Sequence, residues 1–138
     1  MRTWIVPSNP KRFRLIDLLK HRDTIYWMQH VNFEPGDMVF IYSAAPYSRI
    51  MFEMEVVEVN LPYGKYADQV EQSKYWVNPS DYEVAKKHNR CCKFKFIRSF
   101  DSTSLRLANL KVHGLKAAPQ GSMSNLPKLL LDYILSQP

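Results

Sequence analysis

The chain has 138 residues, of which 46% are hydrophobic and 13% aromatic, so it can bury the core of one domain and is not a disordered chain. No run approaches the roughly 20 apolar residues that span a bilayer, and Met1-Arg2 leads directly into a strand-like segment without a signal peptide. The net charge of +6 favours an anionic partner such as nucleic acid. Cys91 and Cys92 are adjacent and form no secreted disulfide framework. We therefore expect a protein of the reducing cytoplasm that does not enter membranes.

The first part of the chain is typical of a strand followed by a helix. Residues 3–7 form a short strand, after which Asn9 can cap a helix and Pro10 can occupy its first turn. An apolar stripe at helical spacing follows in residues 15–19. Residues 24–29 then carry Ile, Tyr and Trp, which favour strands.

The rest of the chain is organised around residues 36–60. Residues 38–42 are apolar on both faces, which predicts an interior strand, and the turn sequence of residues 34–37 leads into it. In the next strand every second residue from 50 to 56 is apolar, and this pattern places Glu53 and Glu55 on the exposed face. The connecting loop, residues 43–49, is too long for a tight hairpin turn, and a ligand-binding loop and an ordinary surface loop are equally compatible with it.

The second half of the chain predicts one more strand and three helices. Residues 61–79 have no clear period, and Ser80 can cap a short helix that ends near residue 88. A strand over residues 90–100 should direct one of the two cysteines inward. Helices should follow at residues 104–113, stopped by Gly114, and at residues 125–135, where Leu129 is among the side chains expected to be buried. The pattern predicts a single α+β domain, residues 1–138, around a strongly bent or barrel-like sheet.

No catalytic constellation is visible in the sequence. Four glycines cannot support a phosphate-binding loop, the cysteines lack Cys-x-x-Cys spacing, and the four histidines are scattered. We therefore expect no enzymatic activity, no metal and no cofactor.

In their order along the chain, the segments resemble an EVE domain. The resemblance begins with the strand containing Trp4, Asn9-Pro10-Lys11, and residues 24–27 and 36–42. It continues through residues 50–59, 98–101, 110–116, 119–121 and 129–134. The EVE family belongs to the PUA-like superfamily, with the YTH and ASCH domains. The resemblance implies a mixed, strongly bent β-barrel with flanking helices and a pocket for a flipped, often modified, nucleobase.

The resemblance also implies roles for particular residues. Ser8 and Asn9 would contact the edge of the base, Trp27 would form one wall, and Tyr42 and Ser43 would lie opposite. Each has a structural alternative, because Trp27 and Tyr42 can pack in the core and Asn9 can act only as a helix cap.

Three basic side chains close to Asn9 would meet phosphates, or alternatively form a solvated helix face: Lys11, Arg12 and Arg14. Phosphate contacts position a nucleic acid without reading its sequence. The expected function is non-catalytic reading of a modified, for example methylated, base in DNA or RNA. The alternative is binding of a small nucleotide-like metabolite or a protein partner. A monomer is the default expectation.

Overall fold

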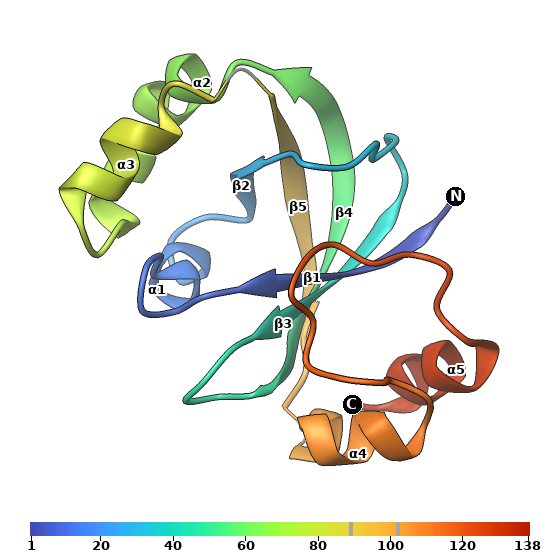
Figure 1. Ribbon diagram of the computed structural model, residues 1–138. Coiled ribbons are helices and arrows are strands. Elements are labelled where there is room, and N and C mark those ends of the chain that lie inside the picture. Colours follow the sequence, from blue (N-terminus) through green and yellow to red (C-terminus); the bar gives the residue numbers. More distant parts are fainter. Residues whose placement is uncertain (89, 102) are drawn as a thin grey trace.

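The computed structural model describes residues 1–88, 90–101 and 103–138, and its centre is a five-stranded sheet (Figure 1). The strand order is β1 (Thr3–Ser8), β3 (Met38–Ser43), β4 (Arg49–Leu61), β5 (Cys91–Ser99) and β2 (Thr24–Met28). β1 and β3 are parallel, and the other three pairs are antiparallel. The α+β class is thus confirmed, and β3 is an interior strand as its two-sided apolar pattern predicts.

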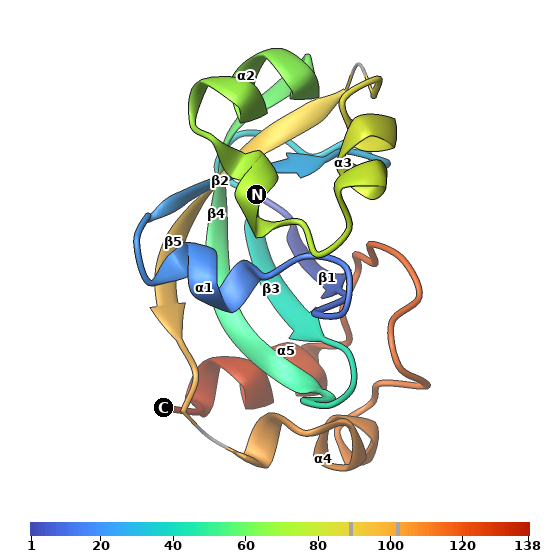
Figure 2. The same cartoon turned by 90° about the vertical axis from the view of Figure 1, so that its left-hand side faces the viewer.

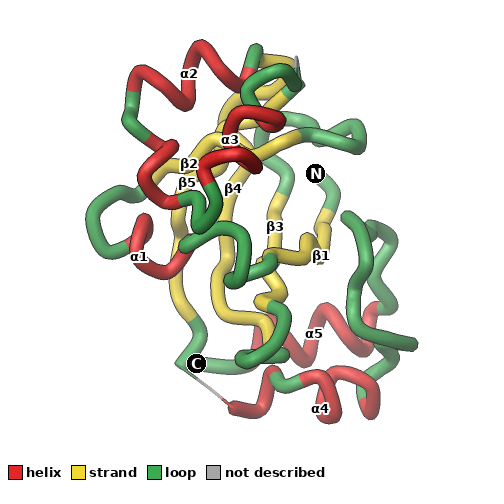
Figure 3. Tube along the Cα trace, turned by 60° about the vertical axis from the view of Figure 1, so that its left-hand side comes forward, coloured by secondary structure: helices red, strands yellow, loops and turns green. Residues whose placement is uncertain are grey.

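The predicted strongly bent sheet is confirmed, but the sheet is not closed, so the term barrel describes it only loosely. β1 and β2 are its two edges, and the long curve of β3 and β4 is visible in Figure 2. Non-strand groups occupy each edge. The backbone of Ile5 exchanges two hydrogen bonds of 2.9 Å with Met123, so the loop before α5 runs beside β1 (Figure 3). On β2, the side chain of Gln72 bonds the backbone of Tyr26.

Helices cover both faces of the sheet, which explains why β3 is apolar on both sides. Trp4, Val39 and Phe94 share one buried cluster with the helix α1 (Leu15–Leu19). Ile5 and Phe40 belong to a second cluster, under α4 (Leu107–Val112) and α5 (Lys128–Ser136). A short 3-10 helix, η2 (Thr103–Leu105), precedes α4, and Gly114 follows it with a positive φ of 114°.

The stretch without a clear sequence period is helical. It contains α2 (Tyr63–Gln69) and a 3-10 helix, η1 (Gln72–Tyr75), and α3 (Pro79–Ala85) follows. Tyr63 and Tyr82 form a third buried cluster here with Cys91, whereas Cys92 packs in the first cluster. The prediction of an inward cysteine is thus confirmed for Cys92, which packs with Phe94, and Cys91 is buried as well, on the opposite face of β5.

The alternation predicted for β4 fails at two places. Glu53 is only 8% exposed, and its Oε1 lies 3.0 Å from Nε of Arg98 on β5, so the predicted exposed position is wrong. A register shift between Ile41 and Tyr42 then pairs these residues with Phe52 and Ile50. Met51 is the extra residue of this bulge, and it moves Ile50 to the face opposite Phe52.

Three of the predicted helix details are also wrong. The carboxamide of Asn9 accepts a hydrogen bond from the backbone N–H of Lys11, 3.0 Å away, so it caps a turn that precedes α1. Asn78, and not Ser80, caps α3. In α5, Leu129 is 63% exposed because Leu130 and Ile134 face the sheet instead.

Candidate functional site

A pocket of about 420 Å³ lies where a closed barrel would join its two edge strands. The end of β1 and the strand β2 form two of its sides. The remaining lining comes from the turn after β1, from His30 after β2, from α2 and the η1 region, and from residues 120–122. The pocket is thus assembled from segments that are far apart in sequence and meet at the open seam of the sheet.

Aromatic rings form much of the pocket wall. The ring of Phe13 lies 6.3 Å from that of Trp27 and 5.3 Å from that of Trp76, nearly perpendicular to both. One face of the half-buried Trp27 is stacked along Phe94, with 6.0 Å between ring centroids and 26° between planes. Phe94 thus covers part of one face of the Trp27 ring.

A fixed polar group lies among these rings. The hydroxyl of Tyr63 accepts hydrogen bonds from Nε2 of Gln72, at 3.0 Å, and from Nε1 of Trp76, at 3.1 Å. Burial raises the pKa of Tyr63 to about 12, against the opposing effect of these two donors, so the hydroxyl is neutral at physiological pH. Gln72 is held by Tyr26, whose backbone N–H donates to Oε1 at 3.0 Å and whose carbonyl accepts from Nε2 at 2.7 Å.

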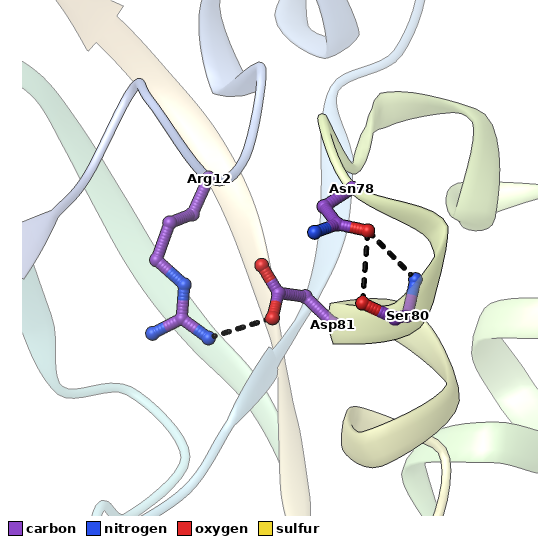
Figure 4. A network of polar contacts seen from close by, with 4 residues as sticks. All are labelled: Arg12, Asn78, Ser80 and Asp81. Carbon is purple, nitrogen blue, oxygen red and sulfur yellow. Dashed lines mark hydrogen bonds and ion pairs between the residues drawn. The ribbon is translucent and has the colours of Figure 1, made fainter.

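The mouth of the pocket carries a cation that is already paired. Arg12 lines the pocket, and its Nη2 lies 3.5 Å from Oδ1 of Asp81 on α3 (Figure 4). Asp81 is in the first turn of that helix, where Asn78 accepts hydrogen bonds from the backbone N–H and the hydroxyl of Ser80. The beginning of α3 thus places a carboxylate beside Arg12.

The pocket brings together part of the predicted set of base-contacting residues. Ser8, Asn9 and Trp27 line it. Tyr42 is 3% exposed and packs in the second cluster, and the hollow that it lines also includes Leu107. Ser43 lines a third hollow, beside Tyr47 of the loop between β3 and β4. The loop therefore contributes no residue to the lining of the aromatic pocket.

The three predicted phosphate-contacting residues are also separated. Arg12 is at the pocket mouth, and Lys11 is exposed next to it. Arg14 lines a separate hollow with Arg22 and Lys74, and its guanidinium donates to the backbone carbonyl of Lys74. Only two of the three cations are thus at the turn that borders the aromatic pocket.

Four residues important to the pocket were missed in the sequence: Phe13, Tyr63, Gln72 and Trp76. Three of them come from residues 61–79, where the only available signal was a local density of aromatic residues. Within the described part of the chain, no group of three or more His, Cys, Asp or Glu side chains could hold a metal ion. No helix of the described residues is long and apolar enough to cross a membrane.

The EVE domain family matches residues 2–134. Solved structures with the same fold include an ASCH protein from Zymomonas mobilis, with a TM-score of 0.71 and 11% identity over 97% of this chain and 94% of that one. A hypothetical protein from Leishmania major has a TM-score of 0.65 and 21% identity, covering 98% and 92%. Human THYN1, in complex with 5-methylcytosine containing DNA, has a TM-score of 0.61 and 16% identity, covering 99% and 96%. Among proteins with curated descriptions, none matches this sequence.

Proposed function

Because this chain belongs to the EVE domain family, we propose that it is a non-catalytic module that reads a modified nucleobase in DNA or RNA. The observation that carries the proposal is the aromatic pocket at the open seam of the sheet, with Arg12 at its mouth. Human THYN1, a protein of the same fold, is complexed with 5-methylcytosine containing DNA, which supports a methylated base as the guest.

The energetics of base extrusion are compatible with this pocket. A base that leaves its stack loses a few kcal/mol, and stacking on an aromatic side chain contributes about 1–3 kcal/mol per base. Phe13, Trp27 and Trp76 offer such surfaces, and their apolar character suits an added methyl group. The volume of about 420 Å³ is within the range of small-molecule sites.

The polar groups of the pocket favour binding over catalysis. Among the described lining residues there is no aspartate or glutamate, and Arg12 and His30 are the two side chains with cationic forms. A general acid–base mechanism needs a positioned proton acceptor. The hydroxyl of Tyr63 is buried and holds its proton, which leaves His30, with no carboxylate beside it among the described lining residues, as the one side chain of a usual general-base type. Recognition by stacking and edge hydrogen bonds needs no such group.

The proposal is tested by measuring binding of the purified protein to single- and double-stranded oligonucleotides that carry a panel of modified bases. We expect tighter binding to at least one modified base than to its unmodified parent, and weaker binding as salt rises. Equal binding to modified and unmodified bases would overturn the proposal that the protein recognises a modified base. If the protein binds free nucleotides independently of salt and does not bind oligonucleotides, this result would instead support the small-metabolite alternative.

A further inference from the structure

We infer that Tyr63 is a specificity-determining residue whose hydroxyl donates a hydrogen bond to the guest, so that the pocket selects bases with an acceptor at that edge. The acceptor is a carbonyl oxygen or an unprotonated ring nitrogen. The inference rests on the proposed function and names one chemical requirement of the base that the pocket takes.

The Tyr63 hydroxyl receives two hydrogen bonds and donates to neither partner. Oε1 of Gln72 accepts from the backbone N–H of Tyr26, which fixes the orientation of the carboxamide and leaves Nε2 as the donor to Tyr63. The indole N–H of Trp76 is a donor only. Both bonds therefore use the Tyr63 oxygen as the acceptor, and its single proton is not used by either.

The hydroxyl proton of Tyr63 needs an acceptor from outside this group of side chains. Among the described residues, none accepts a hydrogen bond from the Tyr63 hydroxyl. Once a guest displaces water from the pocket, an O–H group left without an acceptor is costly, so a guest that supplies an acceptor is favoured. A guest that presents an N–H at this point would add a third donor to an oxygen that already receives two.

The hydroxyl of Tyr63 lies at the pocket. The ring of Tyr63 packs in the third cluster with Ala67 and Tyr82, and Trp76 of the aromatic wall packs against the same cluster. The hydroxyl is the end bonded to Gln72 and Trp76, and both of these side chains line the pocket together with Tyr63. With a pKa raised to about 12, the hydroxyl keeps its proton and stays a donor at every physiological pH.

The test removes the acceptors of the base one at a time. The probe is a single-stranded oligonucleotide with one 5-methylcytosine, compared with 5-methyl-2-thiocytosine, which lacks the carbonyl oxygen, and with 3-deaza-5-methylcytosine, which lacks the ring nitrogen. If the wild-type protein prefers another base of the panel, the equivalent changes are made in that base. We expect one of the two changes to weaken wild-type binding about five- to tenfold, the worth of one hydrogen bond.

Tyr63→Phe should abolish this loss of affinity, so that the variant protein binds the parent base and the analogue equally. Tyr82→Phe is the matched control, because it removes another buried hydroxyl, one that donates to Asp68 and does not line the pocket. This variant should keep the wild-type penalty.

The inference is overturned if neither change weakens wild-type binding, a result that does not depend on whether Tyr63→Phe folds. It is also overturned if folded Tyr63→Phe keeps the penalty. Wild-type protein that binds no base of the panel would instead defeat the proposed function itself.

Discussion

Arg12 at the pocket mouth is paired with Asp81, whose carboxylate lies 3.5 Å from the guanidinium (Figure 4). The Arg12 side chain is 60% exposed and that of Asp81 is 31% exposed, and such surface pairs contribute about 0–1 kcal/mol. A phosphate can therefore replace Asp81 as the partner of Arg12 at little cost. The carboxylate would still repel the phosphate, so it weakens the binding of any nucleic acid at this mouth.

We predict that Asp81→Asn increases affinity for an oligonucleotide roughly two- to fivefold at low salt. The substitution removes the repulsion between the carboxylate and the phosphate, which is worth about 0.5–1 kcal/mol. Asp132→Asn is the control, since it makes the same charge change in an exposed ion pair with Lys128 on α5, away from α3 (Figure 1). Titrations of both variants against the same oligonucleotide test this prediction. Equal gains in the two would mean that net charge matters and the position of Asp81 does not.

A second prediction concerns the edge of β2. Gln72→Leu should destabilise the protein by about 2–4 kcal/mol, because it leaves the backbone N–H and carbonyl of Tyr26 without partners in a partly buried site. Urea unfolding measures the loss. Gln69→Leu, at an exposed position of α2, is the matched control and should change stability by less than about 0.5 kcal/mol. A stable Gln72→Leu protein would contradict the role given to this side chain.

The strands were predictable because their signals are local. Alternation or two-sided hydrophobicity over five or more residues is sufficient to identify β1, β3 and β5. The bulge in β4 was not predictable, since Met51 is as apolar as its neighbours and only the partner strand shows that it is an extra residue. The alternation predicts an exposed Glu53 for a similar reason, because its partner Arg98 is 45 residues away in the chain.

The site was predictable only in part, again because of sequence distance. Ser8, Asn9 and Trp27 follow recognisable segments, and they line one pocket. The polar group around Tyr63 depends on hydrogen bonds between residues 26 and 72, which are 46 positions apart. A buried glutamine in a stretch without period cannot be distinguished from a surface glutamine until the fold is known.

A third prediction concerns acid stability and Asp37. This carboxylate is fully buried and accepts hydrogen bonds from the backbone N–H groups of Arg2, at 2.9 Å, and Glu34, at 3.0 Å, and from the indole of Trp4, at 3.0 Å. Burial alone would raise the pKa of Asp37, but these donors outweigh it and the pKa is lowered. A depressed folded-state pKa adds stability above the unfolded value of about 3.9, and this stability is lost as pH falls through the folded value.

Melting temperatures from pH 7 down to pH 2 therefore should show a larger gap between wild type and Asp37→Asn at neutral pH than at the acid end. Glu55→Gln, at an exposed position of β4, is the control and should follow the wild-type curve. A gap that is constant across the whole pH range would show that the ionisation of Asp37 does not contribute to stability.

The last prediction separates recognition of the base from contact with the phosphate. If a base stacks on Trp27, Trp27→Ala should cost about 1–3 kcal/mol of binding, and Trp27→Phe should cost less because a smaller ring remains. Preference for the modified base over the plain base should decrease together with affinity. Arg12→Gln should instead weaken binding to both bases equally and reduce the slope of the salt dependence by about one, since a phosphate does not report which base is present.

Loss of folding is the main confounder in the Trp27 series, because the ring packs against Phe13 and Phe94 and removal of a core tryptophan can cost about 3–5 kcal/mol of stability. Each variant therefore needs an unfolding curve before its affinity is interpreted. Trp27→Phe protects the test, because it keeps an aromatic ring beside both neighbours. If folded Trp27→Ala binds with unchanged affinity and unchanged preference, the base does not stack on this ring, whatever Arg12 contributes at the mouth.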